Sequence, residues 1–97
     1  MRIPKTVKIG GKTYRIEQTT RLDLGKLNCS GEIDYMNLEI RIVPAAQERM
    51  EVVLLHELTH AIFDHLGHVN HDEKLIDELA NALHMVIKDN PDMLKGE

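Results

Sequence analysis

Two short runs near the start of the chain alternate between apolar and polar residues. The first run holds Val7 and Ile9, and the second holds Tyr14 and Ile16. The glycine pair Gly10-Gly11 lies between them and tolerates the positive φ angles of a two-residue hairpin turn. We therefore predict a hairpin in which the four apolar side chains share one face of a sheet.

A second alternating stretch predicts another hairpin, with its turn at Met36-Asn37. This turn would pair Tyr35 with Leu38. It would also pair Ile33 with Ile40, so that the apolar side chains stay on one face. The opposite face carries charged residues only, namely Glu32, Asp34, Glu39 and Arg41. We expect that face of the sheet to be exposed to water.

A long stretch after the second hairpin has the spacing of an amphipathic helix. Pro44 suits the first helical position, and residues 45–66 contain neither glycine nor proline. Apolar residues recur three and four positions apart, at Met50, Val53, Leu54, Leu58, Ala61 and Ile62. Because Gly67 is a suitable C-terminal stop, we predict a helix over about residues 44–66.

A second helix is predicted over about residues 71–89. Asn70 is its expected N-cap, and Pro91 ends it by restricting the backbone of Asn90. Its apolar face would comprise Leu75, Ile76, Leu79, Ala80, Leu83, Val86 and Ile87. Together the elements predict a single α+β domain over residues 1–97. A small antiparallel or mixed sheet of about three or four strands, formed by residues 5–43, would pack on the two helices.

Composition narrows the range of functions. The 97 residues carry a net charge of −4, which argues against a nucleic-acid partner. The longest apolar run, Val52–Leu55, is too short to cross a membrane. The chain start lacks the apolar segment of a secretory signal, and the single Cys29 excludes an intrachain disulfide, so we expect a cytoplasmic protein. Residues 18–30 show no clear period and receive no assigned element.

The motif that carries chemistry is His56-Glu57-Leu58-Thr59-His60, an H-E-x-x-H sequence inside the first predicted helix. His56 and His60 are four residues apart, so both rings project from one face and can bind one zinc ion. Glu57 lies beside them and can take a proton from a water held by the metal, which makes it the expected general base. The apolar flanks favour this interpretation over two exposed surface histidines, because buried histidines need polar partners.

Tetrahedral zinc with one open position needs a third protein ligand. An extended motif with a third histidine would require glycine at position 63 and histidine at position 66, where this chain has Phe63 and Leu66. The donors downstream of the motif are His65, His68, His71, Asp72, Glu73, Asp77 and Glu78. We choose Glu73, at the border of the second helix's apolar face. Asp77, one turn later, can accept the free N–H of a ligand histidine.

Alternatives to this ligand set stay open at the level of the sequence. With Asn70 as N-cap, Glu73 falls at N3, where glutamate commonly closes a capping interaction instead of binding a metal. Asp77 is equally well read as a solvated helix residue. His68 and His71 lie in the connection between the helices and are the strongest rival ligands. A fourth protein ligand from either would make the zinc site structural.

The chain resembles the zincin metallopeptidases, and among them the gluzincin-like small phage and prophage proteins related to the ImmA/IrrE family. The likeness rests on residues 55–62 (Leu-His-Glu-Leu-Thr-His-Ala-Ile), on Glu73–Leu83 and on Lys88–Pro91. It implies a small sheet over an active-site helix with a supporting helix. It also implies zinc on the two motif histidines and a downstream carboxylate, with Glu57 as general base.

The resemblance also implies how substrate binds. An edge strand, here Ile33–Tyr35 or Leu38–Ile42, would take a peptide as an added strand. Members of the family often carry E-x-E-A-N on the second helix. This chain has Asp-Glu-Leu-Ala-Asn there, at Asp77–Asn81. The difference leaves Glu73, Asp77 and Glu78 in competition for the role of third ligand. Candidate groups to steady the oxyanion are Tyr35, His68 and His84.

The leading hypothesis is a zinc-dependent metallopeptidase that hydrolyses peptide bonds through a metal-activated water. Its cofactor would be Zn²⁺, and its substrate a peptide or an extended protein segment. The alternative is a binding or regulatory module on the same fold, in which the sheet edge holds a partner protein and little peptidase activity remains. Neither nucleic acid nor membrane is an expected partner.

Overall fold

The computed structural model describes residues 1–22 and 30–95 of the chain. Cys29 and the centre of the unassigned stretch 18–30 lie outside the described residues. The described elements, in chain order, are the strands β1 (Thr6–Ile9), β2 (Lys12–Gln18), β3 (Gly31–Asp34) and β4 (Glu39–Ile42), and then the helices α1 (Gln47–His65) and α2 (Glu73–Asp89).

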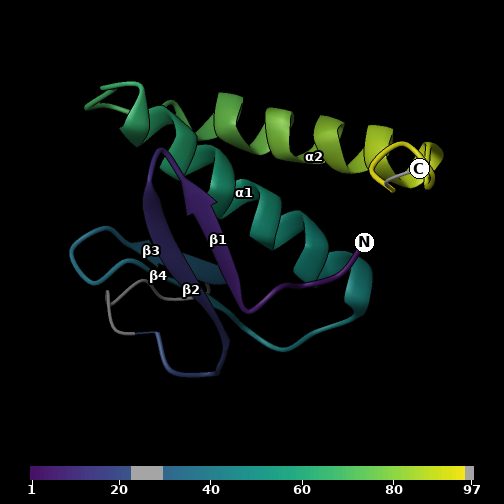
Figure 1. Cartoon of the computed structure of the whole chain (residues 1–97), viewed down its shortest axis with the longest axis horizontal. Coiled ribbons are helices and arrows are strands. Elements are labelled where there is room, and N and C mark those ends of the chain that lie inside the picture. The colour runs from purple at the N-terminus through teal and green to yellow at the C-terminus, as the bar shows by residue number, and fades with distance from the viewer. Residues whose placement is uncertain (23–29, 96–97) are drawn as a thin grey trace.

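The predicted α+β class is confirmed, and the elements form three layers. The four strands make one mixed sheet in the order β1-β2-β4-β3, in which β2 and β4 run parallel and the two outer pairs run antiparallel. Helix α1 packs on the sheet, and α2 packs on the far side of α1 without contacting the described strands (Figure 1). The helix that carries the H-E-x-x-H motif is therefore the middle layer.

Both predicted hairpins form, but the second has a longer turn. Gly10 and Gly11 have φ angles of 56° and 85° and close the first hairpin as predicted. Val7 lies opposite Tyr14, which agrees with the predicted shared face. In the second hairpin Ile33 lies opposite Ile40, also as predicted.

The predicted pairing of Tyr35 with Leu38 is wrong, because residues 35–38 all belong to the turn. Asp34 Oδ1 accepts hydrogen bonds from the backbone N–H groups of Met36 and Asn37 at 3.1 and 3.0 Å, which stabilises a longer turn. Leu38 leaves this turn with a φ angle of 53°.

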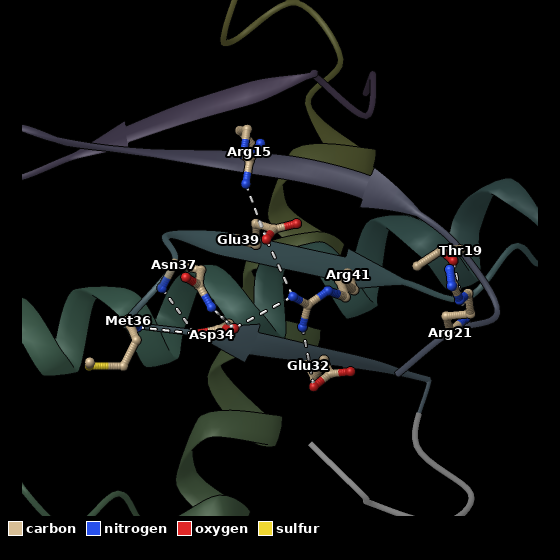
Figure 2. A network of polar contacts seen from close by, with 9 residues as sticks. All are labelled: Arg15, Thr19, Arg21, Glu32, Asp34, Met36, Asn37, Glu39 and Arg41. Carbon is tan, nitrogen blue, oxygen red and sulfur yellow. Dashed lines mark hydrogen bonds and ion pairs between the residues drawn. The ribbon is translucent and has the colours of Figure 1, made fainter. Parts of the chain in front are cut away.

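The outer face of the sheet is not uniformly exposed, which corrects a second expectation. Glu32 and Arg41 are only 2% and 6% exposed. The guanidinium of Arg41 lies 3.6 Å from Glu32, 3.5 Å from Asp34 and 3.3 Å from Glu39 (Figure 2). Burial of these charges is possible because opposite charges compensate one another, a non-local pairing that the alternation of the sequence does not reveal.

The opposite face of the sheet forms the core with α1. Its fully buried side chains include Tyr14, Ile40 and Ile42 from the sheet and Leu54 and Ala61 from the helix. This aliphatic packing fixes the rotation of α1, so that the motif lies along the border between the helix and edge strand β3. Strand β4 is paired on both sides, so among the described strands the sheet edge beside the motif is β3, not Leu38–Ile42.

Helix α1 begins three residues later than Pro44. Val43 still donates a backbone hydrogen bond to Ser30, and Ala46 is extended with ψ at 145°, so the chain reaches a helical conformation only at Gln47. The end of the helix agrees with the prediction. Gly67 has a φ angle of 91°, and its N–H donates to the Asp64 carbonyl at 3.0 Å, the C-terminal arrangement that glycine favours.

Helix α2 is capped by Asp72, not by Asn70. The Asp72 carboxylate accepts from the backbone N–H groups of Lys74 and Leu75, which starts the helix at Glu73. The predicted C-terminal end at Asp89 is confirmed. Among the described residues, no helix is long and apolar enough to span a membrane.

The apolar face of α2 is less buried than its pattern predicts. Because α1 is the one described element that α2 packs against, only a narrow stripe at Ile76, Ala80 and His84 is buried. Four further apolar side chains of the predicted face are exposed by more than a third: Leu75, Leu79, Leu83 and Val86. Ile87 is half-buried. On α1, Ile62 is exposed as well.

A buried polar pair joins the two helices. His84 Nε2 lies 2.8 Å from Glu51 Oε1, and both residues are less than 10% exposed. Burial by itself raises the pKa of the Glu51 carboxyl, but hydrogen bonds from His84 and Gln47 outweigh it and hold that pKa below the usual value of 4.5. The charged form of Glu51 is therefore stabilised by the fold.

The Gly10-Gly11 turn offers a matched test of backbone strain and close packing. Alanine at either position is strained by about 1 kcal/mol because both φ angles are positive. A Cβ at Gly10 also collides with the His65 ring, whereas one at Gly11 meets open space. We expect Gly10→Ala to lower the free energy of unfolding, measured in urea, more than Gly11→Ala does. The excess should disappear in a His65→Ala background, and an equal effect at both glycines would contradict the packing argument.

The lowered pKa of Glu51 predicts how stability depends on pH. The unfolded chain binds a proton at Glu51 more readily than the folded chain does, so this contribution is present above pH 4.5 and is lost as the pH falls through the folded pKa. Glu51→Gln should therefore destabilise the metal-free protein most near pH 7, and the difference from wild type should shrink toward pH 3. Urea titrations across this range measure it, and a constant difference would refute the linkage.

Candidate metal centre

The motif residues with donor atoms, His56, Glu57 and His60, face one side of α1. Their region of the sequence lacks helix breakers and has strong apolar flanks, so it forms the central turns of the helix. Glu57 and His60 are 5% and 8% exposed, while His56 is half-buried. One donor atom from each of the three lies within 4.8 Å of the others, which is close enough for a shared ion.

Glu73, at the first turn of α2, brings a carboxylate to the same point. Its Oε2 lies 3.5 Å from His56 Nε2, and its Oε1 lies 3.1 Å from His60 Nε2. In a tetrahedral zinc site with Zn–N distances of about 2.0–2.1 Å, neighbouring donor atoms are about 3.3–3.4 Å apart. The two observed distances, each to a different oxygen of the Glu73 carboxylate, lie on either side of this spacing, so Glu73 is close enough to both histidines to share an ion with them.

The start of α2 decides what Glu73 is free to do. The sequence left open that Glu73 caps the helix from position N3. With Asp72 as the N-cap, Glu73 is instead the first helical residue, and the cap hydrogen bonds come from Asp72 itself. The side chain of Glu73 can therefore turn toward the motif histidines without giving up a capping role.

Each motif histidine turns its other nitrogen toward a neighbour. His56 Nδ1 lies 3.6 Å from Asp77 Oδ1, and His60 Nδ1 lies 2.8 Å from His71 Nδ1. Partners at Nδ1 favour the ring orientation in which Nε2 points at the metal. The sequence anticipated Asp77 as such a partner, but it gave no sign of the His60–His71 contact.

Charge in the site also favours metal binding. Burial lowers the pKa of the His60 imidazole, and the nearby rings of His56 and His71 lower it further, whereas Glu73 opposes them. A histidine with a lowered pKa is neutral at pH 7, which is the form that binds a metal.

The rival ligands lie in positions less suited to the ion. Both ring nitrogens of His71 have neighbours, since its Nε2 lies 3.0 Å from the His68 carbonyl oxygen. The His68 ring packs against Phe63 with 5.2 Å between ring centroids. Glu78 is exposed, with its carboxylate 4.0 Å from the Lys74 ammonium. Glu73 is thus the carboxylate from α2 that lies nearest to both Nε2 atoms.

The three converging donors open onto a cleft of about 1040 Å³. Edge strand β3, α1 and the start of α2 form its walls. Tyr35 lies along it, and burial together with the charges of Asp64 and Glu57 raises the pKa of its phenol, so the hydroxyl stays protonated at neutral pH. His68 also lines the cleft, whereas the third oxyanion candidate, His84, is buried against Glu51 outside it.

Two cleft residues were missed at the sequence level. A Cβ at Gly31 would lie 2.6 Å from Val53 Cγ1 and 2.9 Å from the Arg41 carbonyl oxygen, so only glycine lets β3 approach α1 this closely. A glycine inside a strand is a signal of such close approach. At the same end of the cleft, Arg49 donates a hydrogen bond to Ser30 Oγ at 2.6 Å, for which the sequence holds no signal.

Comparisons of the chain with known protein families, curated proteins and solved structures give no match. The zincin resemblance is therefore an expectation that rests on the sequence motifs alone. The donor atoms themselves carry the functional argument: two imidazoles and a carboxylate converge, and a buried carboxylate lies beside them.

The ligand set makes a prediction about zinc affinity. Glu73→Gln removes the negative charge and should weaken zinc binding at least tenfold, about 1.4 kcal/mol. Glu78→Gln, a matched change on the exposed side of the same helix, should leave the affinity within about twofold. Competition titration with a chromogenic chelator measures both. Wild-type affinity in Glu73→Gln together with a loss in Asp77→Asn would assign the third ligand to Asp77 instead.

Proposed function

We propose that the protein is a zinc-dependent metallopeptidase that hydrolyses peptide bonds in an extended segment of polypeptide. The observation that carries this proposal is the convergence of His56 Nε2, His60 Nε2 and the Glu73 carboxylate beside buried Glu57, on a cleft bordered by β3, the outer strand of the described sheet.

The metal would be held by His56, His60 and Glu73. Three protein ligands of types N, N and O, with a fourth position left to solvent or substrate, are the pattern of catalytic rather than structural zinc. In the described part of the chain, His68 and His71 direct their rings to other neighbours, which supports an open fourth position. When bound, zinc supplies Lewis acidity, lowering the pKa of a water to about 7 and polarising a carbonyl.

Glu57 would act as the general base and then as the general acid. Its carboxylate lies within 4.8 Å of donor atoms of both histidines. Because Glu57 follows His56 directly and neighbouring helical positions do not face each other, we assign it to the reacting water and not to the ligand set. It takes a proton from the attacking water as the C–O bond forms. It then gives that proton to the amide nitrogen as the C–N bond breaks, so that an amine leaves.

Edge strand β3 supports an extended substrate. The Val43 N–H donates a hydrogen bond to the Ser30 carbonyl, so Ser30 is at a position that bonds to the β4 side. In an antiparallel pair such positions alternate with positions that do not bond to the partner strand, and Gly31 and Ile33 are at the latter. The backbone groups of Gly31 and Ile33 therefore point away from β4, toward the outer edge of the described sheet, and both residues line the cleft. A peptide that pairs with this edge as an added strand lies across the motif.

Tyr35 is the group best suited to steady the charge that develops on the carbonyl oxygen. It lies along the cleft, and its phenol keeps its proton at neutral pH because its pKa is raised. A protonated hydroxyl can donate a hydrogen bond to an oxyanion.

Glu57→Gln tests the general base. The amide keeps the size of the side chain but accepts no proton, so we expect hydrolysis to fall by about 10²–10⁴-fold while one zinc remains bound. Activity is read by mass spectrometry of a peptide library, and bound zinc by elemental analysis. Glu78→Gln is the matched control and should keep full activity.

The alternative function has a distinct outcome in the same experiment. If wild-type protein holds one zinc and leaves the whole library intact, the peptidase proposal is wrong for this chain. Binding of a partner protein at the β3 edge that is unchanged by Glu57→Gln would then support a binding module.

A further inference from the structure

His71 lies at the end of the α1–α2 connection and contacts His60, a proposed metal ligand. Both of its ring nitrogens have other neighbours, so it is not itself a proposed ligand. We propose that His71 is a positioning residue that sets the tautomer of His60, an inference that rests on the proposed metal centre. By accepting a hydrogen bond from the His60 Nδ1–H group, it keeps the lone pair of His60 Nε2 free and directed at the proposed zinc position.

The two rings meet edge to edge. Their Nδ1 atoms are 2.8 Å apart, while their centroids are 5.0 Å apart and their planes differ by 22°. With the nitrogens so much closer than the centroids, the rings lie nearly in line rather than face to face. Two ring nitrogens at this distance form a hydrogen bond only if one carries a proton and the other does not.

A backbone carbonyl decides which nitrogen carries the proton. His71 Nε2 lies 3.0 Å from the His68 carbonyl oxygen, which can only accept. The proton of neutral His71 is therefore on Nε2, and its Nδ1 is an acceptor. On this basis His60 donates from Nδ1 to His71, and the Glu73 carboxylate, whose Oε1 lies 3.1 Å from His60 Nε2, is the competing acceptor for the same proton.

The C-terminal end of α1 fixes the position of the hydrogen bonds that link His60, His71 and the His68 carbonyl. The reversal at Gly67 lets the His68 N–H bond to the Phe63 carbonyl at 3.0 Å, which fixes the backbone whose carbonyl receives His71. The Phe63 ring packs against both His68 and His71, with centroid separations of 5.2 and 5.7 Å. Asp72 then caps α2 immediately after His71.

The two motif histidines therefore have unlike partners. Asp77 beside His56 is a carboxylate and brings a negative charge. His71 beside His60 is an imidazole and brings none. A neutral partner orients the ligand without adding negative charge near the ion.

The experiment separates orientation from mere packing with two substitutions. His71→Leu keeps bulk but removes the acceptor, whereas His71→Asn keeps an acceptor oxygen near the position of Nδ1. In metal-free wild type, two-bond ¹⁵N–¹H spectra should show His60 protonated on Nδ1. His71→Leu should convert His60 to a mixture with the Nε2–H form, and His71→Asn should retain the wild-type tautomer.

Zinc affinity provides the second readout. Loss of a partner to a ligand histidine typically costs 10–100-fold in metal affinity, so we expect that loss in His71→Leu and recovery to within about threefold in His71→Asn. An Nε2–H tautomer in wild type, or an unchanged tautomer in His71→Leu, overturns the proposal. So does a zinc-induced ¹⁵N shift showing that His71 itself binds the metal. The wild-type tautomer is measured without metal, peptide or variant, so it can fail or succeed independently of peptidase activity and of how the variants fold.

Discussion

The structure depends on the burial of α1 between two layers. The sheet packs on one side of this helix through residues such as Leu54 and Ala61, and α2 packs on another through Ile76 and Ala80. Only a helix held on two sides can keep polar groups such as Glu57 and His60 buried at its border, because their desolvation must be offset by apolar packing around them. The remaining side of α1 faces the cleft, and there the proposed chemistry takes place.

Features set by neighbouring residues were predictable from the sequence. The Gly10-Gly11 turn, the Ile33–Ile40 register and the stop at Gly67 each depend on local backbone preference or on an apolar period, and each is found. The H-E-x-x-H motif was equally readable, because two histidines one turn apart share a face in any regular helix. Its predicted burial results from apolar flanks of the same helix and is found for Glu57 and His60, while His56 is half-buried.

Features that depend on contacts distant in the sequence were not predictable. Alternation marks Arg41 as outward-facing, but it cannot show that carboxylates from the neighbouring strand allow its burial. Asn70 and Asp72 are comparable N-caps by composition, and the path of the connection selects Asp72, which frees Glu73 from a cap role. His71 looked like a loop residue or a rival ligand because only the folded connection brings its ring to His60.

The connection between the helices, residues 66–72, also acts as a spacer. Surface loops usually tolerate changes of length, because their ends do not fix the orientation of the next element. Here one end is fixed by the reversal at Gly67 and the other by the Asp72 cap. A connection of another length would have to follow a different path between these two fixed points, and the first residue of α2 would no longer be held beside the histidines. The length of this loop, and not only its composition, therefore determines where Glu73 lies.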